Sequence, residues 1–264
     1  MAMAVFVPKS AMRNCHLLRT INYMHRREKM PKDTQLAVQD GFDNFFSTDR
    51  TAELLESAKP FLELMMQNEC ALREIETKLN VLNDEFSTMY NYNPIESIKT
   101  RVKDPLSIVE KMQRKGIQPT IANIETTLND IAGVRVICSF PEDIYAIADI
   151  LTMQDDISLI RKKDYIANPK PNGYRSLHLI LGIPIFLSTG KKIMKVEVQF
   201  RTIAMDFWAS LEHKLKYKHS IHNTEEISAK LKECADAITE LDAKMQDIHN
   251  RIERENREAQ ESQE

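Results

Sequence analysis

Two acidic side chains stand beside or inside predicted β-strands, where acids are uncommon. Glu197 lies between two valines in the alternating segment 193–201, IMKVEVQFR, and Asp130 comes just before the segment 132–140, AGVRVICSF. A solvated sheet face would explain Glu197 alone, and a helix or turn cap would explain Asp130 alone. Because neighbouring strands bring distant residues together, the two carboxylates could also form a pair that binds Mg²⁺ together with a substrate phosphate.

A cluster of basic residues precedes these acids in the chain. Residues 99–118 contain six basic and two acidic side chains, a local charge of +4 in a chain whose net charge is −3. In the predicted helix 104–115, Lys111 lies one turn from Ser107 and shares a face with Arg114. Solvated helix faces are often charged, but an excess of one sign favours phosphate binding, for which Arg and Lys side chains are suited.

The third candidate is the loop 168–178, NPKPNGYRSLH, which combines two prolines and a glycine with an aromatic ring and two basic side chains. In extended backbone, Tyr174, Ser176 and His178 point to the same side. A tyrosine on a stiff loop is suited to stacking on a nucleic-acid base. An ordinary turn with a packed tyrosine would have the same composition.

Alternating apolar residues predict a small sheet that could position these groups. Segment 132–140 places Arg135 opposite its apolar side chains, and segment 176–186 contains Pro184, which indicates an edge or a bend. Segment 193–201 alternates more strictly and places on one face Lys195, Glu197, Gln199 and Arg201.

Helices are predicted between and after these strands, over 104–115, 141–153 and 205–218. Asp104 is a suitable N-cap for the first of them, and a proline follows it at the first helical position. Strands mixed with helices in this way predict an α/β (α+β) fold with a small sheet.

Two longer amphipathic helices are predicted on either side of this core, from about Asp49 to Tyr90 and in the C-terminal tail, and Pro60 should break or restart the first of them. Both carry apolar residues at alternating three- and four-residue steps, as in helices that pack along a seam. The seams consist of Leu72, Ile75, Leu79, Leu82, Phe86 and Met89, and of Ile227, Leu231, Cys234, Ile238, Leu241, Met245, Ile248 and Ile252. Such seams pack either onto the core of the same chain or onto another subunit.

Length and composition restrict the classes of protein that remain. A chain of 264 residues can form one large domain, or a domain with helical extensions. Its net charge of −3 argues against bulk attraction to nucleic acid. The four cysteines are widely spaced, which favours free thiols in a reducing cytoplasm over disulfides or a zinc site. The sequence has no apolar run long enough to span a membrane.

The first 27 residues contain no acidic side chain. A transit peptide has this composition, but a loose N-terminal tail, with Met30 as an alternative start, has it too.

In their order along the chain, five segments resemble the synthetase domain of the RelA/SpoT family, over about residues 91–219. The absence of further domains on either side resembles the small alarmone synthetases, and the wording NPKPNGY and AMDFWASLEH is most similar to their RelP-like subgroup. The five segments are RVKDPLSIVEKMQRKG (101–116), NDIAGVRVICSF (129–140), KDYIANPKPNGYRSLHL (163–179), VEVQFRT (196–202) and AMDFWASLEHKLKYK (204–218).

The resemblance implies a pyrophosphokinase of the stringent response with a nucleotidyltransferase-like core around a small mixed sheet. Members transfer the β,γ-pyrophosphate of ATP to the ribose 3′-OH of GDP or GTP, which releases AMP and gives ppGpp or pppGpp. By similarity, Asp130 and Glu197 are the catalytic residues and bind Mg²⁺, and Glu197 also accepts the proton of the 3′-OH.

The same resemblance assigns the two nucleotides to different residues. Arg101 and Arg135 would sandwich the adenine of ATP, and other ATP-binding residues would be Lys103, Ser107, Lys111 and Arg114. Tyr174 would stack on the guanine of GDP or GTP, with help from Arg175, His178, Gln199 and Lys163. Lys163 belongs to the segment 161–164, RKKD, which resembles the RxKD form found in the family. Some relatives carry Asn at the position of Asp206, which leaves its role open.

Three segments are therefore expected: an N-terminal tail (1–47) that is poorly ordered, a synthetase domain with N-terminal helices (48–222), and a C-terminal amphipathic helix (223–264). The last of these would join subunits into a homo-oligomer, by resemblance a tetramer. Packing of the two seams against each other within one chain is the alternative.

Two other functions are compatible with the same residues. One is the toxic branch of the family, which pyrophosphorylates the 3′ end of tRNA, although the net negative charge disfavours an RNA partner. The other is a non-catalytic nucleotide-binding regulator built on an inactive synthetase, against which the presence of Asp130, Tyr174 and Glu197 argues.

Overall fold

The computed structural model describes residues 48–218 and 224–261. Residues 1–59 and 60–264 form two compact units, and the first unit contributes to the described part only the beginning of helix α3 (Thr48–Tyr90). The architecture below is therefore that of the second unit. The predicted tail, residues 1–47, lies outside the described residues, as does Cys15.

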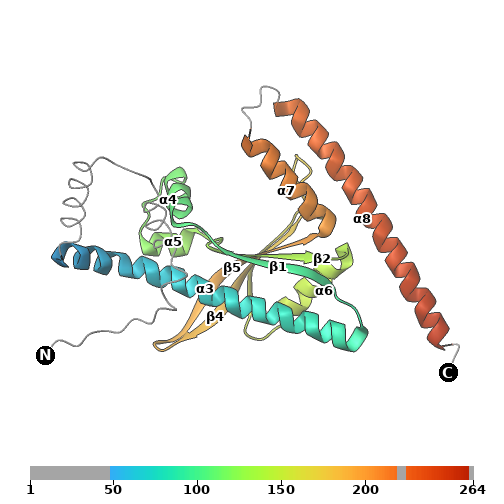
Figure 1. Cartoon of the computed structure of the whole chain (residues 1–264), viewed down its shortest axis with the longest axis horizontal. Helices are drawn as coiled ribbons and strands as arrows, with labels where there is room; N and C mark the ends of the chain where they lie inside the picture. The colour runs from blue at the N-terminus through green and yellow to red at the C-terminus, as the bar shows by residue number, and fades with distance from the viewer. Residues whose placement is uncertain (1–47, 219–223, 262–264) are drawn as a thin grey trace, which may run out of the picture. The chain divides into compact units, whose positions relative to one another are not determined.

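A five-stranded mixed sheet forms the centre of this unit, as predicted (Figure 1). The strand order is β1-β2-β5-β4-β3. Neighbouring strands are antiparallel except β2 and β5, which run parallel. The strands are β1 (Ile95–Val102), β2 (Ala132–Cys138), β3 (Ser158–Asp164), β4 (Leu177–Leu187) and β5 (Gly190–Thr202).

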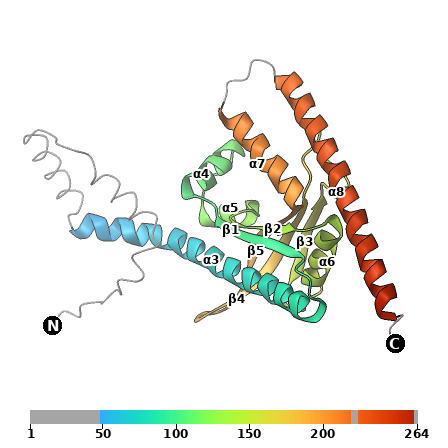
Figure 2. The same ribbon diagram turned by 45° about the vertical axis from the view of Figure 1, so that its right-hand side comes forward.

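One face of the sheet is apolar and forms the hydrophobic core. The predicted alternation in β5 is confirmed, because Val196, Val198 and Phe200 are fully buried. The inner faces of α3 and α6 (Pro141–Thr152) belong to the same core, and α3 runs across the strands (Figures 1 and 2). Packing this face leaves the other face of the sheet for the polar side chains of β2, β4 and β5.

Helices α4 (Pro105–Arg114) and α5 (Ile121–Thr127) lie together between β1 and β2 along the chain (Figure 1). The predicted N-cap is confirmed, since the Asp104 carboxylate accepts hydrogen bonds from the backbone N–H groups of Leu106 and Ser107. Ile108 and Met112 are buried in the core. This anchoring fixes which way α4 presents Lys111.

Three elements were not predicted: β1, β3 and α5. The strands β1 and β3 are the two edges of the sheet, and β3 is exposed along nearly its whole length. Edge strands often carry charged side chains in place of an apolar alternation, so IESIKTRV and SLIRKKD lack the pattern on which strand prediction depends.

Two predictions concerned prolines. Pro60 was expected to break the first long helix, and this is wrong, because α3 continues through it. Glu56 to Pro60 are all exposed, so water can hydrate the carbonyl that loses its helical donor. Pro184, expected at an edge or a bend, lies beyond Gly182, where β4 stops pairing with β3 and keeps only β5 as a neighbour.

The remaining helices are α7 (Ile203–Lys218) and α8 (Thr224–Glu261), which pack against each other (Figure 2). A small second cluster joins them, in which Trp208 of α7 contacts Leu231 and Ala235 of α8. The indole N–H of Trp208 donates to the carbonyl of Leu231, 2.8 Å away. None of the described helices combines the length and apolar character needed to cross a lipid bilayer.

Candidate active site

Two rows of side chains cross all five strands on the polar face of the sheet. Residues paired directly across neighbouring strands share a face, so the pairing register alone places these side chains side by side. The first row is Arg101, Gly133, Glu197, Ile180 and Arg161, and the second row is Lys99, Arg135, Gln199, His178 and Lys163. The register therefore surrounds Glu197 with basic and polar groups from four other strands.

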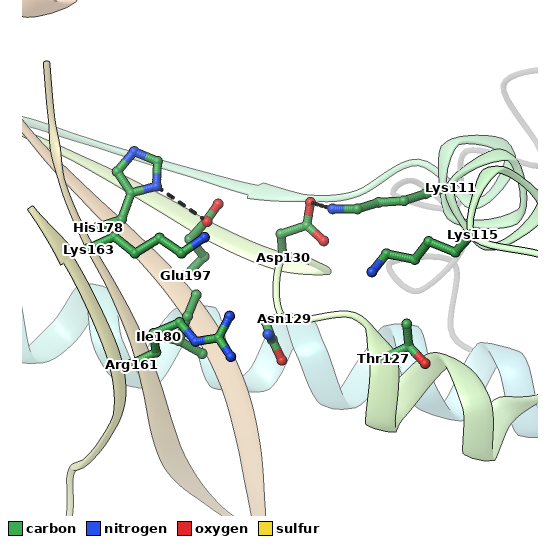
Figure 3. A pocket seen from close by; sticks show the side chains of 10 residues that line it. All are labelled: Lys111, Lys115, Thr127, Asn129, Asp130, Arg161, Lys163, His178, Ile180 and Glu197. Atoms are coloured by element: carbon green, nitrogen blue, oxygen red, sulfur yellow. Dashed lines mark hydrogen bonds and ion pairs between the residues drawn. The ribbon is translucent and has the colours of Figure 1, made fainter. Parts of the chain in front are cut away.

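A cavity of about 230 Å³ opens over the first row (Figure 3). Glu197 and Asp130 both line it, which confirms that the fold brings the two predicted carboxylates into one site. Basic side chains approach them from two directions. Lys111 of α4 and Lys115, just after it, lie on one side, and Arg161 and Lys163 of β3 lie on the other (Figure 3). A pair of acids between two basic walls is suited to a metal-bound polyphosphate.

Asp130 is held by lysines on one side and left open on the other. Its Oδ2 accepts from the ammonium groups of Lys103, at 2.9 Å, and Lys111, at 2.6 Å. Burial raises the pKa of the carboxyl, but the hydrogen bonds and the charges of the two lysines together outweigh burial, and the pKa lies below its ordinary value. The other oxygen, Oδ1, is buried and accepts no hydrogen bond from any described residue.

Glu197 is oriented by its neighbours in the sheet. Its Oε2 accepts from the Gln199 amide at 2.9 Å, and its Oε1 lies 3.5 Å from Nδ1 of His178. Burial raises the pKa of Glu197, whereas the hydrogen bonds from His178 and Gln199, together with the charge of His178, lower it further than burial raises it. The net pKa is below the ordinary value, so the carboxylate is ionised at neutral pH.

A second cavity, of about 380 Å³, lies beside the first and shares Asp130 and Glu197 with it. Arg101 and Arg135 line this second cavity, with Gly133 between Arg101 and Glu197 in the first row. Because Gly133 has no side chain, the floor of the cavity stays open there. Two arginines beside an open floor are suited to hold a planar base.

The loop 168–178 packs on the C-terminal helices. Gly173 has a φ of +88°, and a Cβ at this position would lie 2.5 Å from the Cβ of Ala235 on α8. The Asn172 amide donates to the Glu212 carboxylate of α7 at 3.1 Å. The glycine is therefore required both by its backbone conformation and by the closeness of α8.

Tyr174 follows this glycine and is tied into the sheet through its hydroxyl. The hydroxyl accepts from Arg201 at 2.8 Å and lies 2.9 Å from Nε2 of His178. The Lys170 ammonium lies 4.7 Å from the centroid of the ring. A stacking base would have to displace this exposed lysine.

Five predicted binding residues do not line either cavity, and one of them is Tyr174, whose contacts are given above. Lys103 bonds to Asp130, as described, whereas Ser107 and Arg114 lie on α4 outside both cavities. Arg175 points towards α8, donating to the Ile166 carbonyl at 2.9 Å and lying 3.8 Å from Asp236. The binding and catalytic roles given to all the predicted site residues remain predictions.

Sequence reasoning missed two groups of residues at the site. Arg161, Thr127 and Asn129 line the first cavity, and the exposed edge strand β3 gave no signal for the first of them. Arg201, which is buried, and Asp206, which is half-buried, form an ion pair next to the second row, at 2.8 Å. The alternation places Arg201 on the polar face of β5, and only the close sequence spacing of the two residues suggests their pairing.

The acids also fit a divalent cation. The buried, unpartnered Oδ1 of Asp130 is an oxygen ligand without a donor, and Glu197 faces the same cavity. Among the described residues no group of three or more His, Cys, Asp or Glu side chains could hold a metal ion alone. A cation here would need oxygens from substrate or water, which is the way Mg²⁺ is held with nucleotides.

Comparison with known proteins agrees with this arrangement. The sequence profile described as "Region found in RelA / SpoT proteins" matches residues 100–222. GTP pyrophosphokinase YwaC of Bacillus subtilis is 45% identical over 183 residues, which cover 69% of this chain and 87% of that protein.

Solved structures give the same result. The structure of small alarmone synthetase 1 from Bacillus subtilis bound to its product pppGpp superposes with a TM-score of 0.67 at 36% identity, covering 74% of this chain and 98% of that one. The same enzyme bound to AMPCPP gives a TM-score of 0.61 at 31% identity, with the same coverage. The chain therefore belongs to the RelA/SpoT family, among the GTP pyrophosphokinases called small alarmone synthetases.

Proposed function

We propose that the chain is a (p)ppGpp synthetase, which transfers the β,γ-pyrophosphate of ATP to the ribose 3′-OH of GDP or GTP. The observation that carries this proposal is the pair Asp130 and Glu197, which two cavities share between opposed basic walls. Two adjoining cavities that meet at one pair of acids are suited to two nucleotides whose reacting atoms meet there. Similarity to a synthetase with bound pppGpp supports the same assignment.

The reaction joins the 3′-oxygen of the acceptor to the β-phosphorus of ATP. The bond from the β-phosphorus to the bridging α,β-oxygen breaks, AMP leaves, and the proton of the hydroxyl passes to a base. Glu197 is the base in this proposal, because its lowered pKa keeps it ionised and His178 and Gln199 fix its orientation.

The basic residues stabilise charge on the transferring group. Lys111, Lys115, Arg161 and Lys163 line the cavity and are already in place before charge spreads over the phosphoryl oxygens. Mg²⁺ bound by Asp130 and Glu197 would neutralise part of that charge and orient the phosphates.

The nucleotides are assigned to the two sides of the acid pair. Arg101 and Arg135 would hold the adenine over the open floor at Gly133. Tyr174 would stack on the guanine, with Lys163, His178 and Gln199 on the second row holding the acceptor beside Glu197.

Assembly into a homotetramer is part of the proposal. The outer faces of α7 and α8 expose apolar side chains that the described part of the chain does not cover. Monomeric proteins seldom leave such stripes exposed, and a second copy of the chain is the occupant that the family resemblance favours. These side chains are Ile203, Phe207, Leu211 and Leu215 on α7, and Leu241, Met245, Ile248 and Ile252 on α8.

The test is a transfer assay with labelled ATP and, separately, GDP, GTP and tRNA as acceptors. Label in GDP or GTP supports the proposal, whereas label only in tRNA assigns the chain to the tRNA-modifying branch, and no transfer rejects both. Glu197→Gln keeps the size of the side chain but removes its charge and basicity, so activity should fall by at least ~10³-fold. Thermal unfolding of the same variant checks that the fold is retained, and near wild-type turnover would remove Glu197 from the mechanism.

A further inference from the structure

Arg201 is a buried charged residue and Asp206 is a half-buried one, and the proposed reaction has no use for either. Arg201 is only 5% exposed, and its guanidinium donates to Asp206 Oδ1 and to the Tyr174 hydroxyl, at 2.8 Å in each case. A third, longer hydrogen bond of 3.4 Å reaches the Gln199 side chain. One buried cation is thus bonded both to the tyrosine assigned to guanine and to a carboxylate at the start of α7.

The same carboxylate also reaches the other nucleotide side. Asp206 Oδ1 lies 3.3 Å from Nη1 of Arg135, which lines the second cavity, and Oδ2 lies 4.0 Å from the Lys99 ammonium. Burial and then the nearby charge of Arg201 lower the pKa of Arg135, as expected for two guanidinium groups held close together. Asp206 is the anion that lets these cations approach each other.

On the acceptor side the contacts close into a ring. Arg201 bonds to Tyr174, Tyr174 to His178, His178 faces Glu197, and Gln199 bonds to both Glu197 and Arg201. Because Arg201 can only donate, the Tyr174 hydroxyl accepts from it and offers its own proton to Nε2 of His178. Nδ1–H of His178 is then directed at Glu197, so a displacement of Tyr174 is transmitted to the base.

We propose that Arg201 and Asp206 are positioning residues that couple the two nucleotide subsites, so that a nucleotide bound on one side raises the affinity for the other. A base stacking on Tyr174 fixes the hydroxyl that Arg201 holds, and the shared Asp206 then fixes Arg135 on the donor side. A base between Arg101 and Arg135 acts through the same contacts in reverse, because coupling between two binding sites is reciprocal. This inference rests on the proposed function, since it needs one nucleotide on each side.

The experiment measures binding in place of turnover. Calorimetric titration with α,β-methylene ATP, whose α–β bridge cannot be cleaved, gives the donor affinity of the full chain in Mg²⁺, with and without saturating GDP. In the wild type, GDP should raise that affinity by about fivefold or more, within the usual range for coupled sites.

Two variants break the connection at different points. Asp206→Asn keeps the shape but loses the charge shared by Arg135 and Arg201, and Tyr174→Phe keeps the ring but loses the hydroxyl that Arg201 holds. In both, the effect of GDP on donor affinity should fall towards onefold, even where the separate affinities change. Tyr174→Phe also keeps the proposal testable should Asp206→Asn fail to fold.

A matched control is Asp143→Asn on α6, which alters another part-buried carboxylate that accepts from Tyr92 and Phe140, away from both cavities. It should leave the coupling unchanged. Full coupling in both site variants, or no coupling in the wild type, would overturn the inference, because a merely structural ion pair changes thermal stability and not the mutual dependence of the ligands. A wild type that transfers pyrophosphate without coupling rejects this inference alone, whereas one that neither transfers nor binds the analogue rejects the proposed function.

Discussion

The long helices α3 and α8 carry similar apolar seams in the sequence and use them in opposite ways. Leu72, Ile75 and Leu79 of α3 are buried in the core beneath the sheet. In α8 the start of the seam, at Leu231, packs on Trp208, but Leu241 and Ile248 are 55% and 53% exposed. Alternating three- and four-residue steps therefore predict that a helix has an apolar stripe, but not which surface covers that stripe.

The second half of α8 contacts the domain through polar side chains instead. Gln246 exchanges hydrogen bonds with the backbone N–H and the carboxylate of Glu142 on α6. His249 stacks on the ring of Phe140, with centroids 4.4 Å apart. Asp242 accepts from the Thr202 hydroxyl at 2.6 Å. Hydrogen bonds fix the position of this helix on the domain, and its apolar side chains stay exposed.

The largest expected effect on stability comes from making the same substitution, isoleucine to alanine, in α3 and in α8. Ile75→Ala on α3 removes a fully buried side chain and should lower the free energy of unfolding by about 2–5 kcal/mol. Ile248→Ala on α8 should cost less, and its cost should depend on protein concentration, because the proposed assembly would bury that side chain only between subunits. Denaturant unfolding at two protein concentrations measures both, and equal, concentration-independent losses would contradict the comparison.

A second prediction concerns the exposed stripe itself. Changing Leu241 and Ile248 together to Lys should dissociate the subunits while leaving the cavities intact, since neither residue lines them. Light scattering at micromolar protein should show a tetramer for the wild type and a smaller species for the variant. A wild type that runs as a 30.6 kDa monomer would exclude the oligomer.

The sequence alone predicts some elements and site residues of this protein and misses others. Strands β2 and β5 and the acids Asp130 and Glu197 were predictable, because a central strand with one buried face shows its alternation. Strand β4 was predictable as a continuous apolar run. Arg161 on β3 was not, since an exposed edge strand is chosen for solubility and not for burial. Arg201 was not, because an alternating pattern shows the face on which a side chain lies but not whether another helix covers it. Both omissions depend on tertiary neighbours that no local pattern contains.

The smallest expected effect concerns Asp242, whose buried carboxylate should lower the stability of the folded chain at neutral pH. Burial raises the pKa of Asp242, and the hydrogen bond from Thr202 offsets only part of that rise. The folded chain therefore holds a proton at this site more tightly than the unfolded chain does. The stability that this proton contributes is present below the pKa of Asp242 in the unfolded chain. It is lost as the pH rises through the higher pKa of Asp242 in the folded chain.

Asp242→Asn should then stabilise the protein at neutral pH, because the amide oxygen can still accept from Thr202 and no charge is buried. The gain should be below about 4 °C in melting temperature, roughly 1 kcal/mol for a domain of this size, and should disappear at acidic pH, where Asp242 is protonated. Asp247→Asn, on the exposed side of the same helix, removes the same charge and should change little at any pH. Thermal melts of both variants across this pH range measure the difference. If Asp242→Asn instead lowers the melting temperature at neutral pH, the prediction is wrong. The carboxylate charge of Asp242 would then stabilise the packing of α8 on the domain.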